Sequence, residues 1–86
     1  MMKKIELLGT LGCHLCELAE PIVYSVAKMY GIKVEQVDIA DDPKLTELYG
    51  IRIPVVRLKD DTQTQDLGWP FDESQCEQWL RSINAV

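Results

Sequence analysis

The sequence has no long apolar run and few basic residues, and each shortage excludes a class of protein. No stretch of the 86 residues reaches the roughly 18 consecutive apolar residues that a membrane-spanning helix requires. Nine Lys and Arg stand against fourteen Asp and Glu, and the resulting net charge of −5 repels phosphate backbones. We therefore expect a water-soluble protein that binds neither a membrane nor nucleic acid.

Cysteine is also scarce, because three cysteines are too few, and odd in number, for the disulfide framework of a small secreted protein. This favours a reducing compartment, so we expect a cytoplasmic protein. The first residues, MMKKIELLGTLGC, do resemble an export signal that ends in a lipid-attachment cysteine. Glu6 interrupts the apolar run, however, and the run is barely long enough for a signal peptide. We expect these residues to form a strand instead.

The length and the spacing of apolar residues predict one small domain over residues 1–86. Residues 3–9, KKIELLG, form a short apolar run closed by a glycine, which predicts a buried strand. Apolar residues then recur every three or four positions from Leu15 to Tyr30, which is the pattern of an amphipathic helix. Pro21 lies inside this helix and removes a backbone donor, so we expect a kink there.

The rest of the chain predicts further strands and helices in an α/β order. The expected elements are a strand over 32–40, a short helix over 41–50, a strand over 53–60, an edge strand over 62–67 and a helix over about 72–83. The complete order is β-α-β-α-β-β-α. The right-handed crossover rule makes the first two strands parallel, and a hairpin turning at Asp60-Asp61 adds an antiparallel pair. We therefore expect a four-stranded mixed sheet with helices on both faces.

Cys13 and Cys16 bracket the sequence CHLC at the junction between the first strand and the first helix. A sulfur at this position faces unpaired backbone N–H groups and the positive end of the helix dipole, which favour the nucleophilic thiolate. Cys16 lies one turn further along the helix, where it can attack a mixed disulfide on Cys13. His14 would stabilise the thiolate further when protonated, or it is simply an exposed polar side chain. Glu17 opposes a nearby thiolate by its charge.

Other interpretations of the cysteines stay open at this point. The pair is alternatively two buried thiols, a structural zinc site completed by His14 and Cys76, or ligands of an iron–sulfur cluster between two subunits. Adjacent residues such as Cys13 and His14 point in different directions, and the chain has no second CxxC or histidine pair, which disfavours a metal. Cys76 lies on the apolar face of the last helix, so we expect it to pack in the core.

Three features together resemble the thioredoxin-like superfamily, and most closely its glutaredoxin-like branch, over essentially the whole chain. They are CHLC at the first strand–helix junction, Pro21 five residues after Cys16, and YGIRIPVV at residues 49–56. The resemblance implies a thioredoxin-like fold and a cis Ile53–Pro54 peptide bond beside the redox pair. Because proline has no N–H, it would leave the backbone of Ile53 free to pair with an extended substrate segment. The alternative is a trans proline that starts an edge strand.

The chain departs from the pattern of glutaredoxins that bind glutathione. Those proteins usually carry a basic residue just before the CxxC, whereas residues 10–12 here are Thr, Leu and Gly. They also carry a Gly-Gly turn followed by Asp. Here Gly68 remains, Trp69 replaces the second glycine, and Asp72 stands as the acidic residue at the helix start. Trp69 is either an apolar rim beside the site or a packing residue, and Phe71 is expected to pack.

The resemblance implies a thiol-disulfide oxidoreductase acting on protein or low-molecular-weight disulfides. Cys13 would be the nucleophile, Cys16 the resolving thiol and His14 a residue that tunes them. The chemistry needs no metal and no bound cofactor, and thioredoxin reductase or glutathione, as co-substrate, would be the reductant. We expect a monomer. The alternatives are a glutathione-linked glutaredoxin and a non-catalytic metal-binding or redox-sensing module. The expected substrate-binding residues are Ile53, Pro54, Gly68, Trp69 and Asp72.

Overall fold

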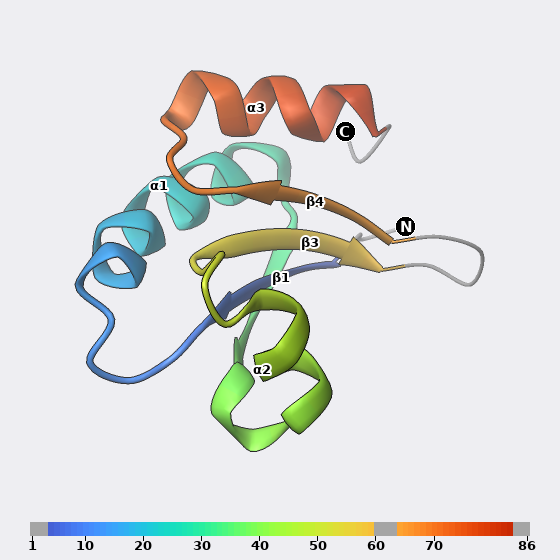
Figure 1. The fold of residues 1–86 in the computed structure, drawn as a ribbon. Coiled ribbons are helices and arrows are strands. Elements are labelled where there is room, and N and C mark those ends of the chain that lie inside the picture. Colours follow the sequence, from blue (N-terminus) through green and yellow to red (C-terminus); the bar gives the residue numbers. More distant parts are fainter. Residues whose placement is uncertain (1–3, 60–63, 84–86) are drawn as a thin grey trace.

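The computed structural model describes residues 4–59 and 64–83, and its elements follow the predicted order (Figure 1). They are β1 (Lys4–Gly9), α1 (His14–Tyr30), β2 (Lys33–Asp38), the 3-10 helix η1 (Ile39–Asp41), α2 (Pro43–Tyr49), β3 (Val55–Lys59), β4 (Thr64–Gly68) and α3 (Glu73–Ser82). The turn predicted at Asp60-Asp61 lies outside the described residues. No helix in the described ranges is long and apolar enough to cross a membrane.

The strands form one mixed sheet in the order β2-β1-β3-β4. β1 pairs with β2 in parallel, while β3 runs antiparallel to both β1 and β4. Figure 1 shows α1 and α3 on one face of this sheet and α2 on the other. The structure thus confirms the predicted thioredoxin-like fold, a mixed sheet of four strands with helices on both faces.

Several element boundaries differ from the predicted ones by one or two residues, and two of these differences have a clear local cause. The second strand ends at Asp38, because the carboxylate of Asp38 accepts the N–H of Ala40 at 2.9 Å and starts the turn of η1. The third strand begins at Val55 because the preceding Ile53 donates its N–H to the carbonyl of Tyr49, extending the end of α2. The first helix is unbroken through Pro21, which lies on its exposed side.

The alternation of side chains along β1 divides the core between the two faces of the sheet. Ile5 and Leu7 point to the face covered by α1 and α3, while Leu8 points to the face covered by α2. The buried residues of the larger cluster are Ile5, Leu7, Ala19, Val23, Val26, Ala27, Ile32, Val56, Phe71, Cys76, Leu80 and Ile83. Those of the smaller cluster are Leu8, Ile39, Tyr49 and Val55. β1 is therefore buried on both faces, as its apolar run predicted.

Cys76 and Phe71 belong to the larger cluster, which confirms that both pack in the core. Cys76 is fully buried, and this burial raises the pKa of its thiol to about 11. The ring of Phe71 meets the ring of Trp69 edge to face, with their centroids 5.2 Å apart. Trp69 is half-buried and therefore packs at the edge of the core.

An ion pair lies almost buried on the α2 face of the sheet. Glu6 and Arg57 are opposite each other in the antiparallel register of β1 and β3. The Nε and Nη2 atoms of Arg57 each lie 3.0 Å from Oε1 of Glu6, and the guanidinium carbon lies 5.7 Å from the ring centre of Tyr49. Arg57 is only 8% exposed. Its cation therefore depends on Glu6 for compensation.

We predict that Glu6→Leu lowers the free energy of unfolding by about 3 kcal/mol, because it leaves the Arg57 cation buried without its partner. Urea denaturation followed by circular dichroism measures this loss. The double variant Glu6→Leu/Arg57→Met should recover most of it, since both charges are then replaced by apolar groups. Glu35→Gln, which breaks the exposed ion pair with Lys4, is the control and should barely move the midpoint. Equal losses for Glu6→Leu and Glu35→Gln would contradict the prediction.

Candidate active site

The two cysteines of the CxxC lie where β1 ends and α1 begins. Between them and the strand, the chain turns through Gly12, whose φ of 79° is a left-handed conformation that glycine adopts without strain. Cys13 is the N-cap of α1, and its Sγ accepts the backbone N–H of Cys16 at 3.2 Å. The sulfur of Cys13 therefore occupies the place where a helix offers its unpaired N–H groups.

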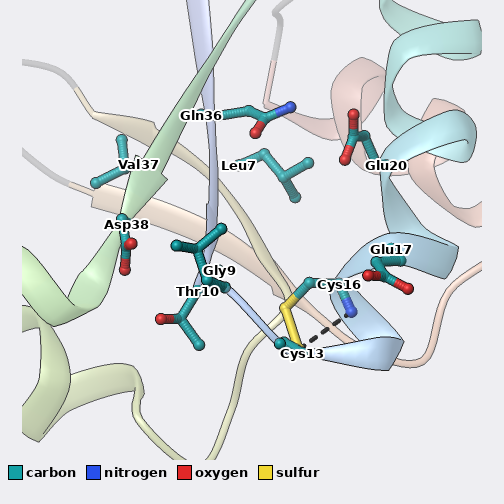
Figure 2. A pocket seen from close by; sticks show the side chains of 12 residues that line it. Leu7, Gly9, Thr10, Cys13, Cys16, Glu17, Glu20, Gln36, Val37 and Asp38 are labelled. Carbon is teal, nitrogen blue, oxygen red and sulfur yellow. Dashed lines mark hydrogen bonds between the residues drawn. A yellow bond between two sulfur atoms is a disulfide. The ribbon is translucent and has the colours of Figure 1, made fainter.

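Cys13 and Cys16 are joined by a disulfide, with their Cα atoms 5.2 Å apart (Figure 2). This separation lies in the usual range for a disulfide, so one turn of helix suffices to bring the two sulfurs together. Both cysteines are half-buried. The pair is thus part of the surface and has the geometry for exchange between a dithiol and a disulfide.

The backbone of Gly9, at the end of β1, packs directly against Cys16. A Cβ atom at Gly9 would lie 3.1 Å from the Sγ and 3.3 Å from the Cβ of Cys16, tighter than ordinary packing. The sequence marked Gly9 only as the end of a strand. Glycine at a strand end can also signal close backbone approach, which is the signal that would have found this contact.

His14 is an exposed side chain whose imidazole faces Glu17. Its side chain is 80% exposed, and its Nδ1 lies 3.7 Å from a carboxylate oxygen of Glu17. This arrangement favours the interpretation of His14 as an exposed polar side chain over that of a residue in contact with the sulfurs.

The strand register brings the predicted substrate-binding residues to the same end of the sheet as the CxxC. Leu8 is opposite Val55, and Val55 is opposite Gly68. Pro54 therefore lies beside the end of β1, and Gly68 lies one strand further along the same end of the sheet. The backbone N–H of Trp69 donates to the carbonyl of Pro54 at 3.1 Å. The Ile53–Pro54 and Trp69–Pro70 peptide bonds are both cis, the second of which the sequence analysis did not include.

One expectation about this loop is wrong in part. The backbone of Ile53 is not free, because its N–H donates to the carbonyl of Tyr49 at 3.1 Å. Gly50 and Arg52 also donate to carbonyls of the last turn of α2, so the chain leaves that helix as a tight turn. Ile53 can therefore offer a substrate its carbonyl oxygen but not its N–H.

Asp72 has a structural role at the start of α3. Its carboxylate accepts the N–H of Gln75 at 2.8 Å, and the side chain of Gln75 accepts the N–H of Asp72 at 2.9 Å. This reciprocal capping box satisfies two backbone donors of the helix end. Asp72 remains exposed to solvent.

A cleft of about 390 Å³ opens beside the disulfide, and no local pattern in the sequence indicates it. Figure 2 shows its walls, which come from β1 and the following loop, the first turns of α1 and the end of β2. Only the parallel pairing of β1 and β2 brings these segments together. The lining residues are Leu7, Gly9, Thr10, Leu11, Gly12, Cys13, Cys16, Glu17, Glu20, Gln36, Val37 and Asp38.

The ligand set considered for zinc is not assembled. Among residues 4–59 and 64–83, no three or more His, Cys, Asp or Glu side chains form a group suited to a metal ion. Cys76 is enclosed in the larger core cluster on α3, while His14 is exposed on α1. The pair of cysteines therefore stands without further ligands from the described part of the chain.

Comparisons with known proteins agree with this arrangement. The family model described as Glutaredoxin-like domain (DUF836) matches residues 4–81. The structural-genomics target protein XcR50 from X. campestris is 32% identical, with a TM-score of 0.75, over 91% of this chain and 96% of that one. Protein Ne2328 from Nitrosomonas europaea is 26% identical, with a TM-score of 0.72, over 92% of each chain.

Thioredoxin 1 from Thermosipho africanus TCF52B is 20% identical, with a TM-score of 0.71, over 94% of this chain and 93% of that one, which shows a shared fold. No curated protein matches the chain. The family match spans nearly all of the described residues and includes the CxxC and both segments that flank it. The chain therefore belongs to the glutaredoxin-like domain family, with a thioredoxin-like fold.

Proposed function

We propose that the protein is a cytoplasmic thiol-disulfide oxidoreductase that cycles Cys13 and Cys16 between a dithiol and a disulfide. The observation that carries the proposal is the hydrogen bond from the Cys16 N–H to the Cys13 Sγ at the start of α1. In the reduced protein, the same donor and the positive end of the helix would stabilise a Cys13 thiolate, the form that attacks disulfides.

The reaction is two successive thiol–disulfide exchanges. The Cys13 thiolate attacks one sulfur of the substrate disulfide, forms a mixed disulfide, and releases the other substrate sulfur as a thiolate that takes a proton. Cys16 then loses its proton, attacks the Sγ of Cys13 and releases the second substrate thiol. Two electrons pass from the cysteines to the substrate, and a reductant, thioredoxin reductase or glutathione, restores the dithiol. No bound cofactor enters these steps.

The neighbouring loop would hold the substrate. Pro54 and Gly68 lie at the same end of the sheet as the CxxC, which supports a substrate running past both cysteines and this loop. The carbonyl of Ile53 is its proposed backbone acceptor, and the half-buried Trp69 its apolar contact. His14 would tune the thiolate from outside, through charge alone, and Asp72 would face polar groups of the substrate.

A redox titration tests this function against its alternatives. We predict a reversible two-electron transition of Cys13 and Cys16 in glutathione buffers of graded potential, and separately with thioredoxin reductase. Alkylation of free thiols and mass spectrometry measure this transition. Cys76 should stay unmodified in the folded protein, because burial raises the pKa of its thiol to about 11. Zinc and iron are measured in the same samples. The proposal would be wrong if the dithiol never oxidises, or if Cys13 and Cys16 hold one metal ion per chain.

Replacing Cys13 and replacing Cys16 should affect the mixed disulfide in different ways. Cys16→Ser should trap a stable mixed disulfide with a substrate, because no second thiol remains to attack it, whereas Cys13→Ser should form none. Non-reducing mass spectrometry after mixing with a small disulfide distinguishes them. Cys76→Ala is the matched control and should exchange at the rate of the parent protein. Equal trapping by both serine variants would contradict the assigned roles.

Gly9→Ala should slow the second exchange step several-fold, because the new methyl group would lie 3.1 Å from the Sγ of Cys16 and must displace it. The measurement is the lifetime of the mixed disulfide in a stopped-flow experiment. Urea unfolding of the same variant serves as the control. The midpoint should change little, because alanine is less unfavourable in a strand than glycine, which offsets the cost of shifting Cys16 by a few tenths of an ångström. A mixed-disulfide lifetime equal to that of the parent protein would contradict the prediction, because it would show that Cys16 shifts without losing reactivity.

A further inference from the structure

Among the described residues, carboxylates line the cleft beside the redox pair and no basic side chain does. Glu17 and Glu20 line it from α1, Asp38 lines it from the end of β2, and its lining includes no Lys, Arg or His. Figure 2 shows these acids on opposite sides of the disulfide. A volume of about 390 Å³ is enough for a small organic molecule whose sulfur reaches the cysteines.

The charges of these acids are only partly compensated within the protein. Glu17 faces His14 at 3.7 Å, where both side chains are largely exposed. Asp38 accepts one backbone N–H, that of Ala40, which leaves its carboxylate charge in place. Among the ion pairs of the described residues, none joins Glu20 or Asp38 to a cation. The cleft thus presents a negative field to whatever enters it.

This field acts on a molecule that enters the cleft, because the acids and the two cysteines line the same cavity. Charges interact through water over about 8–10 Å at moderate salt, and a cleft with charges of one sign raises the local concentration of the opposite sign. The carboxylates also oppose a thiolate by like-charge repulsion. A positively charged group in the cleft would offset that repulsion, while a negatively charged group would add to it.

We propose that the redox pair acts on small disulfides whose arms carry amines, and that the cleft discriminates against anionic disulfides such as oxidised glutathione. This rests on the proposed function and names its substrate class. The reaction is the one described above: the two cysteine sulfurs supply two electrons, the substrate S–S bond breaks, and two aminothiols leave with two protons. Glu20 and Asp38 are the specificity-determining residues.

The test compares three small disulfides that differ in charge. Reduced protein is mixed with cystamine, which carries ammonium groups, with neutral 2-hydroxyethyl disulfide, and with dithiodiglycolate, which carries carboxylates. Each rate is divided by the rate of the same disulfide with dithiothreitol, which removes intrinsic differences in reactivity. We expect the normalised rate for cystamine to exceed that for dithiodiglycolate by about tenfold or more at low salt, and the ratio to fall as salt rises.

The variant Glu20→Gln/Asp38→Asn should lower this ratio several-fold, whereas the matched variant Glu47→Gln/Glu77→Gln, which removes two charges outside the cleft, should leave it unchanged. A ratio near one, or a ratio that the cleft variant leaves intact, overturns the proposed selectivity while exchange with the neutral disulfide still supports the oxidoreductase. If the protein reacts with none of the three disulfides, the proposed oxidoreductase function itself is overturned.

Discussion

The pairing of β1 on both of its edges is the constraint on which the rest of the structure depends. Leu8 is opposite Val37 on the parallel side and Val55 on the antiparallel side, so β1 is the buried centre of the sheet. The chain leaves this strand at Gly9 and enters α1 within a few residues. The redox pair is therefore held against the core by the end of a central strand, with the loop of Pro54 on one side and the acidic cleft on the other.

Opposing electrostatic influences meet at the CxxC. The backbone N–H of Cys16 and the start of α1 favour negative charge on the sulfur of Cys13. Glu17, Glu20 and Asp38 oppose it from the walls of the cleft. These influences on a charge at the Cys13 sulfur therefore have opposite signs. The glutaredoxin-like fold is kept here, while the surroundings of the pair differ from those of a glutathione site in lacking a basic residue before the CxxC.

Outside the CxxC, the third cysteine and a buried cation are both enclosed by the fold. Cys76 is fully buried among apolar residues of α1, α3 and the sheet, and burial keeps its thiol protonated. On the other face, Arg57 is charged but held by Glu6 beneath α2, where it packs near Tyr49. Both groups are therefore enclosed in the structure, whereas the CxxC is half-buried at the end of the sheet.

The sequence by itself determined the order of elements, the burial of β1, the place of the CxxC at a helix start and the packing of Cys76, because each follows from local periodicity or from adjacent residues. Only the tertiary structure decided the contact of Gly9 with Cys16, the hydrogen bond from the Ile53 N–H to the Tyr49 carbonyl, and the acidic cleft. Asp38 at the end of β2 and Glu20 on α1 come from different elements and line the same cleft. Such contacts depend on packing between segments far apart in the chain, which local patterns do not specify.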